Sequence, residues 1–272
     1  MKRRVSFNLQ ILPVENAFIS AVSSAAFYGR GIFTSIAIYD AKPFLWKKHW
    51  HRLEEAGARL EIDLNDFNED AVNAALRRLI AENKLENGRA RLTFFDESAG
   101  RIWNLNADTG TSLFMTTAEF QKTGAEYLLT ISPFPVNSKS PLAGIKSCNY
   151  LENLLALEEA GKRGFDEAIR LNEREEIVSA SMANIFWVKD EEIFTPALET
   201  GCLKGTTREF LMENLAVRET TSKIGELFAA DEIFLTSAGI GVRPARFQKV
   251  EKKISRTAAK LGKLLDLHKV KS

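Results

Sequence analysis

The chain has 272 residues, of which 45% are hydrophobic and 27% charged, and this composition is typical of a folded globular protein. Its 37 basic and 36 acidic residues leave a formal charge of +1, so no large net field would attract nucleic acid or anionic lipid. We therefore expect its partner to be a small molecule and exclude nucleic-acid and membrane-binding roles.

Targeting and metal signals are weak. Asn8, Gln10, Glu15 and Asn16 interrupt every apolar run near the start, and no later stretch is long enough to cross a bilayer. The two cysteines show no metal or redox spacing, so we expect a cytoplasmic protein. Of the three histidines, two stand two residues apart on a predicted helix, where they would not face one another; no metal site is expected.

The first half of the chain alternates strands and helices. Hydrophobic periodicity predicts strands at 31–40 and 41–46, helices at 47–62 and 68–88, and strands at 89–95 and 111–120. These elements predict a smaller N-terminal α/β domain over residues 1–117, followed by a polar connector at 118–126.

The second half carries its own pattern. We expect strands at 127–134, 167–171 and 231–238, a hairpin at 184–196, and helices at 149–164, 205–217 and 222–229. A basic C-terminal helix has an apolar stripe, so we expect it to pack rather than to bind nucleic acid. The fold class is α+β, with a larger C-terminal domain over 127–272.

Lys146 is the residue that carries the chemistry. It lies in GIKSCNY, a short segment of small residues between a predicted strand and a predicted helix, where side chains commonly point into clefts. A lysine becomes a nucleophile when burial or a neighbouring cation lowers its pKa. Taken alone, this segment fits a solvated surface lysine far better than a nucleophile.

Six motifs, taken in their order along the chain, support a catalytic role for Lys146. They are YGRGIFTS (28–35), HWHRLEEAGARL (49–60), KSCNYLENLLALEEA (146–160), ANIFWVKDEEIFTP (183–196), TGCLKGTTREF (200–210) and ADEIFLTSAGIGVRP (230–244). Together they resemble the fold-type IV family of pyridoxal-phosphate enzymes, which includes branched-chain and D-amino-acid aminotransferases and aminodeoxychorismate lyases. The resemblance implies a two-domain α+β fold with pyridoxal 5'-phosphate between the domains, and a homodimer.

The resemblance also implies roles for individual residues. Lys146 would hold the cofactor as a Schiff base, and Arg52 would bind its phosphate. The phosphate would also meet the free backbone N–H groups where a helix begins at Gly205. The other residues expected to contact the cofactor are Tyr150, Ser179, Thr206, Thr207, Thr236 and Ser237.

One position departs from the family pattern. Relatives usually have a glutamate five residues before the asparagine of N-[IL]-F, where its carboxylate keeps the pyridine nitrogen protonated; here that residue is Ser179. Glu176 would point to the opposite face of the strand, because it lies an odd number of residues away. A hydroxyl cannot stabilise a pyridinium, so the ring should be a weaker electron sink.

The expected substrate contacts are Tyr28, Phe33, Ser35 and Arg101. The sequence Phe33-Thr34-Ser35 resembles the F-T-T of some aminodeoxychorismate lyases. The R-x-H pair that binds the substrate carboxylate in D-amino-acid aminotransferases is incomplete, because Arg101 is followed at that spacing by Trp103.

Three functions remain open. The leading hypothesis is an α,β-elimination like that of 4-amino-4-deoxychorismate lyase, which releases pyruvate and 4-aminobenzoate and demands less charge storage in the ring. The alternative is a class IV aminotransferase for D- or branched-chain amino acids. The third is a protein that binds pyridoxal phosphate without turnover.

Overall fold

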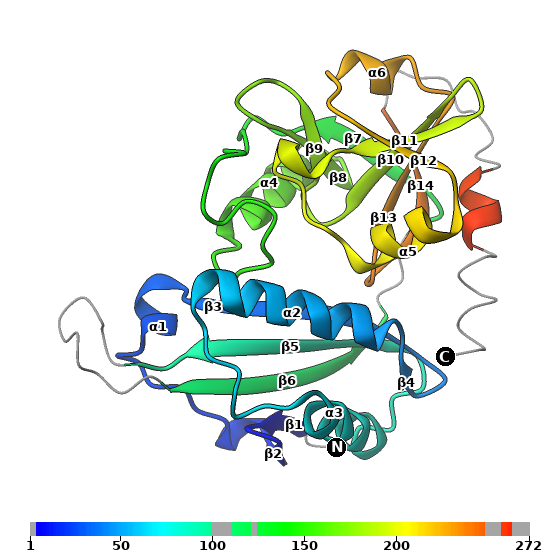
Figure 1. The fold of residues 1–272 in the computed structure, drawn as a ribbon. Helices are drawn as coiled ribbons and strands as arrows, with labels where there is room; N and C mark the ends of the chain where they lie inside the picture. The colour runs from blue at the N-terminus through cyan, green and yellow to red at the C-terminus, as the bar shows by residue number, and fades with distance from the viewer. Residues whose placement is uncertain (1–3, 99–109, 121–123, 248–256, 263–272) are drawn as a thin grey trace. The chain divides into compact units, whose positions relative to one another are not determined.

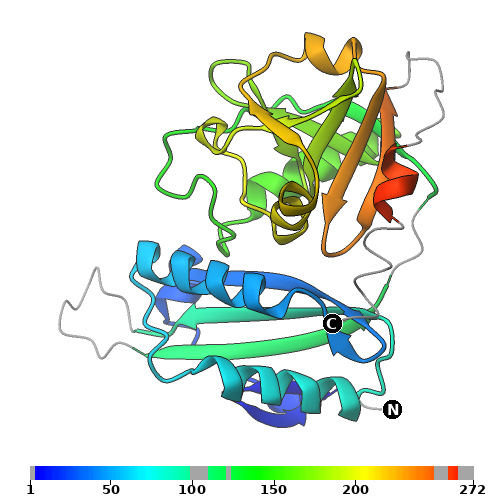
Figure 2. The same ribbon diagram turned by 45° about the vertical axis from the view of Figure 1, so that its right-hand side comes forward.

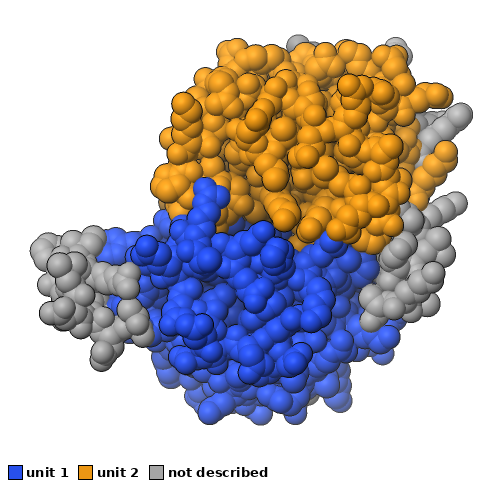
Figure 3. Space-filling model, viewed as in Figure 1, with its two compact units in different colours: residues 1–121, 146–149, 272 blue, residues 122–145, 150–271 orange. Residues whose placement is uncertain are grey.

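The computed structural model describes residues 4–98, 110–120, 124–247 and 257–262. The chain divides into two compact units, drawn in different colours in Figure 3. Unit 1 comprises residues 1–121, 146–149 and 272, and unit 2 comprises residues 122–145 and 150–271. The segment 146–149 therefore packs with the N-terminal unit, although it lies well beyond the predicted connector at 118–126.

Unit 1 contains a six-stranded antiparallel sheet in the order β2-β1-β6-β5-β3-β4 (Figure 1). Helix α2 packs against β3, and α3 packs against β1, β2 and β6. Its elements are β1 (Arg4–Phe7), β2 (Gln10–Pro13), η1 (Val14–Asn16), α1 (Ser24–Tyr28), β3 (Gly31–Tyr39), β4 (Lys42–Pro43), α2 (Trp46–Leu60), α3 (Glu69–Glu82), β5 (Gly88–Asp96) and β6 (Thr111–Glu119).

The buried face of α2 follows the helical period that the sequence predicts. Trp46, Trp50 and Leu53 are buried at spacings of four and three residues, and His49 is buried beside them. His51 lies on the exposed side, where it pairs with Glu55. The two histidines therefore point to different sides of the helix.

Unit 2 contains a mixed eight-stranded sheet, whose strands run from green to orange in Figure 2. The strand order is β12-β11-β10-β13-β14-β7-β8-β9. The pairs β11–β12, β14–β7 and β7–β8 are parallel. Its elements are β7 (Tyr127–Ile131), α4 (Leu151–Lys162), β8 (Glu167–Leu171), β9 (Ile177–Ala180), β10 (Asn184–Lys189), β11 (Glu192–Pro196), η2 (Leu198–Thr200), α5 (Thr206–Asn214), β12 (Val217–Thr220), α6 (Gly225–Phe228), β13 (Glu232–Ser237) and β14 (Gly241–Phe247).

One face of this sheet forms a hydrophobic core around Trp187, Ile169, Ile185 and Leu235, all 1% exposed or less. On the other face α4 packs against β8 and α5 against β13. The sequence predicted a helix through residue 217, but α5 ends at Asn214, because Leu215 is extended and leads into β12. Strand β12, the strands β1 and β2, and β14 were not anticipated.

No helix in the described ranges is long and apolar enough to cross a membrane. Of the C-terminal segment, only residues 257–262 are described, and they are helical. Ala258 and Leu261 of the predicted apolar stripe are buried.

Candidate active site

The backbone of Lys146 is fixed against the start of β3 in unit 1. The N–H of Phe33 donates to the carbonyl of Lys146 at 2.9 Å, and the N–H of Cys148 donates to the carbonyl of Gly31 at 2.8 Å. Glycine is needed at position 31, since a Cβ there would meet the Phe94 carbonyl oxygen at 2.7 Å and the Cys148 sulfur at 2.9 Å. The backbone of Lys146 is thus held by hydrogen bonds to the start of β3.

The surroundings of Lys146 favour a neutral amine. Burial, followed by the charges of Arg52 and Arg91, lowers the pKa of Lys146 to about 7. Its Nζ lies 4.6 Å from the centroid of the Phe33 ring, and the Cζ of Arg91 lies 3.6 Å from the same centroid. Near neutral pH a large fraction of Lys146 is therefore an unprotonated nucleophile, as the sequence hypothesis requires.

Arg52 is oriented by a buried threonine and histidine. Its Nη2 donates to the Thr34 hydroxyl at 2.6 Å, and Thr34 Oγ1 lies 2.7 Å from His49 Nδ1. A hydroxyl oxygen can accept two hydrogen bonds and donate one, so the imidazole tautomer decides which of Thr34 and His49 donates in the bond between them. Burial, with smaller contributions from Arg52 and Lys146, lowers the pKa of His49 well below its usual value, so the ring is a neutral imidazole near pH 7.

The sequence hypothesis missed Arg91 and His49. Arg91 is exposed on β5 directly opposite Ser35, and its Nε donates to Thr93 at 3.1 Å. Ser35 and Phe33 share the β3 face that Arg91 covers, because side chains two apart point the same way. The alternation of residues along the strand after Arg89 could have shown that Arg91 points to one face of the sheet. The sequence could not show which strand pairs with this one, so it could not place Arg91 near Lys146.

The second predicted group lies in unit 2, where α5 begins. Gly205 is the N-cap of α5, and its carbonyl accepts from the N–H of Glu209. A Cβ at Gly205 would collide with the Asn184 side-chain oxygen, so a larger residue at this position requires that side chain to move. Thr206 and Thr207 form the first turn of α5, and the N-terminus of a helix is an arrangement that binds anions.

Thr236 adds a hydroxyl to this group. It pairs with Asn184 across the strands β13 and β10, so the two side chains share a face. Thr236 is 0% exposed, and within the described part of the chain its hydroxyl has no hydrogen-bond partner. An orphaned buried hydroxyl costs free energy unless a ligand satisfies it. The neighbouring Ser237 is half-buried at the end of β13.

Ser179 lies on β9 opposite Arg170 of β8. Tyr150 directly precedes α4, and its electrostatic interaction with the Arg170 guanidinium contributes to raising the pKa of that arginine, against the larger lowering by burial. The two predicted ring contacts, Tyr150 and Ser179, are thus both neighbours of one buried arginine that the sequence hypothesis did not consider.

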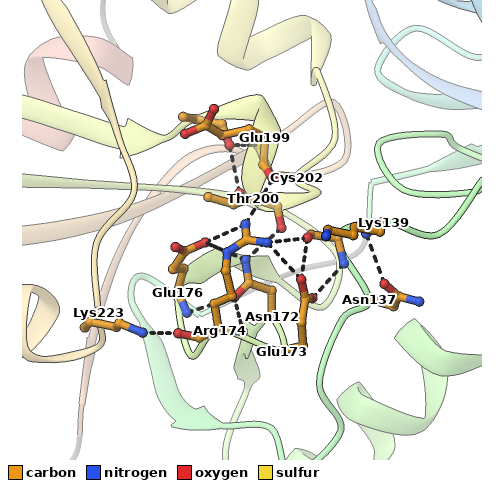
Figure 4. A network of polar contacts seen from close by, with 12 residues as sticks. Asn137, Lys139, Asn172, Glu173, Arg174, Glu176, Glu199, Thr200, Cys202 and Lys223 are labelled. Carbon is orange, nitrogen blue, oxygen red and sulfur yellow. Dashed lines mark hydrogen bonds and ion pairs between the residues drawn. The ribbon is translucent and has the colours of Figure 1, made fainter.

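Glu176 belongs to a separate polar network at the turn before β9 (Figure 4). Its carboxylate accepts from Arg174 at 2.8 Å and from Asn172 at 2.8 Å. The Arg174 hydrogen bond is the largest cause that lowers the pKa of Glu176, followed by the bond from Asn172. This carboxylate is therefore engaged within the turn.

The remaining predicted substrate contacts are spread along unit 1. Tyr28 is the last residue of α1 and is 41% exposed, whereas Phe33 is 3% exposed beneath Lys146 and Arg91. Arg101 lies outside the described residues.

Comparisons with known proteins agree across nearly the whole chain. A family model described as amino-transferase class IV matches residues 31–246. Aminodeoxychorismate lyase of Bacillus subtilis (strain 168) is 27% identical over 262 residues, which cover 90% of this chain and 85% of that protein. The branched-chain-amino-acid aminotransferase of Escherichia coli (strain K12) is 26% identical over 257 residues, covering 88% and 83%.

Solved structures show the same fold. A branched-chain aminotransferase from Thermoproteus uzoniensis matches with a TM-score of 0.92 and 22% identity, covering 100% of this chain and 96% of that one. A putative 4-amino-4-deoxychorismate lyase from Legionella pneumophila matches with a TM-score of 0.85 and 23% identity, covering 94% and 97%. The predicted fold class is confirmed, and the similarities do not separate a lyase from an aminotransferase.

Proposed function

Because the chain belongs to the amino-transferase class IV family, a family of pyridoxal-phosphate enzymes, we propose that it is a lyase acting on 4-amino-4-deoxychorismate. The reaction gives pyruvate and 4-aminobenzoate. The observation that carries the choice is the hydroxyl of Ser179, opposite Arg170, at the position where the family places a carboxylate.

The residues present fit the cofactor. Lys146 is an amine with a pKa of about 7, Gly205 opens the start of α5, and the buried Thr236 hydroxyl lacks a partner among the described residues. Lys146 would hold the aldehyde of pyridoxal phosphate, and Arg52 would bind its phosphate. When bound, the cofactor supplies an electron sink for charge developing at the substrate carbon that bears the amine.

In the proposed reaction Lys146 removes the proton from the amine-bearing ring carbon of the substrate, as a neutral base near pH 7. The ether bond to the enolpyruvyl group then breaks, and the departing enolpyruvate takes up a proton to become pyruvate. The remaining ring is aromatic, so the atoms balance without an oxidant. Arg91, a cation beside Lys146, would pair with a substrate carboxylate.

Ser179 favours elimination over transamination. A hydroxyl does not stabilise a protonated pyridine as a carboxylate does, so charge at the substrate carbon is poorly stored. Transamination requires that storage, because the proton must return at a different atom. Elimination driven by aromatisation requires less storage of charge in the ring, since the leaving group departs with the electron pair of the broken bond.

The alternative is an aminotransferase for D- or branched-chain amino acids, which the relatives of that name favour. Lys146 would then move a proton between the substrate carbon and the cofactor. A lesser alternative is a protein that binds pyridoxal phosphate without turnover.

The deciding experiment uses the purified full chain loaded with pyridoxal phosphate. It is incubated separately with D-alanine, L-leucine, L-glutamate and aminodeoxychorismate, and pyridoxamine phosphate, pyruvate and 4-aminobenzoate are quantified by chromatography. We expect equimolar pyruvate and 4-aminobenzoate, and no pyridoxamine phosphate within the same time. Rapid stoichiometric pyridoxamine phosphate with any amino acid would establish the aminotransferase, and no product from any substrate would favour the binding protein.

We also propose that the protein is a homodimer. Large apolar side chains are exposed together in residues 14–28, among them Phe18 at 75% and Val22 at 56%. Large apolar side chains exposed in one segment favour a protein–protein contact over a free surface. Sedimentation of the wild type should give a dimer, and a Phe18→Asp/Val22→Asp variant should sediment as a monomer.

A further inference from the structure

Arg170 and Ser179 form a polar pair on one face of the unit 2 sheet. They are directly opposite in the antiparallel pairing of β8 and β9, so their side chains project from the same face with Cβ atoms about 5 Å apart. The preceding pair, Ile169 and Ala180, points to the other face and belongs to the hydrophobic core. Any group bound at Ser179 therefore lies on the sheet face from which Arg170 also projects.

The Arg170 guanidinium is a buried charge. Its side chain is 2% exposed, its Nε donates to the Phe134 carbonyl at 3.1 Å, and its Nη2 donates to the Pro135 carbonyl at 3.4 Å. No hydrogen bond to the described residues uses Nη1. Burial lowers the pKa of this arginine, yet a guanidinium stays protonated at any physiological pH.

The positive charge of Arg170 is only weakly neutralised by a nearby carboxylate. Among the described residues the carboxylate paired with Arg170 is that of Glu152, at 3.5 Å, and the Glu152 side chain is 78% exposed. An exposed partner at this distance screens little of the charge. Helix α4 lies over the same face, since the Asn153 side chain donates to the Ser181 carbonyl at 2.6 Å. The positive charge is therefore shielded from water and acts strongly on its neighbours.

We propose that Arg170, acting beside Ser179, holds the pyridine nitrogen of the bound cofactor unprotonated. A cation within about 4–6 Å disfavours a second positive charge and lowers the pKa of the group that would carry it. Ser179 can donate its hydroxyl proton to a neutral nitrogen, which a carboxylate cannot do. The two residues thus act in the same direction, and Arg170 becomes a specificity-determining residue.

This inference rests on the proposed function, because it assumes that the ring nitrogen lies at Ser179. It also deepens that proposal. A neutral nitrogen makes the ring a weak electron sink, which suppresses transamination while allowing an elimination that aromatisation drives. The lyase preference then depends on a positive charge as well as on a missing carboxylate.

The test is the nitrogen-15 resonance of the full chain loaded with pyridoxal 5'-phosphate labelled at the ring nitrogen, followed from pH 6 to 9. We compare the wild type with Arg170→Leu, Arg170→Lys and an Arg170→Leu/Ser179→Glu double variant. Arg218→Leu is the control, because Arg218 is a 67% exposed arginine of β12 paired with Glu192. Melting temperatures identify variants that fail to fold.

We expect an unprotonated nitrogen in the wild type, Arg170→Lys and Arg218→Leu across this range. Arg170→Leu should raise the pH at which half of the nitrogen is protonated by about one unit or more, and the double variant should be protonated at pH 7. If the role of Arg170 were purely structural, Arg170→Leu would lower the melting temperature without moving this titration. Arg170→Lys would then not restore the melting temperature.

A protonated nitrogen in the wild type, or the same titration in Arg170→Leu, would overturn the inference. Borohydride reduction followed by mass spectrometry of the Lys146 peptide keeps the two proposals distinguishable. Cofactor bound at Lys146 with a protonated nitrogen would refute the role of Arg170 alone. Absence of any bound cofactor would refute both proposals.

Discussion

The two candidate groups of this protein bind charge by different means. The Lys146 group of unit 1 contains the titratable amine of Lys146 and the charges of Arg52 and Arg91, and the neutral Thr34 and His49 orient Arg52. The α5 group of unit 2 contains backbone N–H groups and the Thr236 hydroxyl, around a glycine held tightly against Asn184. The first group should therefore respond to pH and charge, and the second to added side-chain volume.

Removing the amine should have the largest effect. Lys146→Ala loses both the cofactor attachment and the proton carrier, so we expect product formation to fall by about 10³-fold or more. Lys139→Ala, in a different segment of the chain, should leave the rate unchanged. Retention of more than a tenth of the rate in Lys146→Ala would contradict the assignment.

Gly205→Ala should weaken cofactor binding by about 10- to 100-fold, because the new Cβ collides with the Asn184 side-chain oxygen at the start of α5. Equilibrium titration with pyridoxal phosphate measures the effect. Gly225→Ala is the matched control, since a Cβ there meets nothing within 4 Å. A Gly205→Ala/Asn184→Ala variant should recover part of the affinity if the collision is the cause.

Thr34→Val should cost about tenfold in affinity for pyridoxal phosphate, because Arg52 and His49 lose the hydroxyl between them. Affinity for pyridoxal, which has no phosphate, should change little. Equal losses for both ligands would indicate that Thr34 supports the fold rather than the orientation of Arg52.

Arg91→Gln should move the pH dependence of the Lys146 amine. Burial, with help from Arg52 and Arg91, lowers its pKa to about 7, so its rate of attack on pyridoxal should rise through pH 7 and then level. Removing one cation raises the pKa, which moves this rise to higher pH. Because the unfolded chain keeps its proton up to about pH 10, the apo fold should also gain stability between pH 7 and 10. Arg218→Gln should leave the rate profile unchanged.

The smallest effect expected is that of Thr236→Val. Its hydroxyl has no partner in the described structure, so the variant should bind cofactor a few-fold more weakly and lose no stability. Thr195→Val provides the contrast, because that equally buried hydroxyl donates to the Ile185 carbonyl at 2.9 Å and its loss should cost about 1 kcal/mol. Denaturant unfolding of both apo variants measures the difference.

The sequence by itself determined the elements with long, regular hydrophobic patterns, such as α2 and β3, and the family to which the chain belongs. It also placed Lys146 in a loop between a strand and a helix, and Gly205 at the start of a helix, since small residues and turn signals are local. It did not anticipate β1, β2 and β12, which are four residues each and too short to show a period.

Only the tertiary structure decided which side chains meet. Arg91 lies over Phe33 because β5 pairs with β3, and Arg170 lies beside Ser179 because β8 pairs with β9. The return of residues 146–149 to unit 1 likewise depends on backbone bonds to Gly31 and Phe33, more than a hundred residues away. Strand partners and registers depend on contacts distant in sequence, and these contacts set the charges around the lysine and the expected ring site.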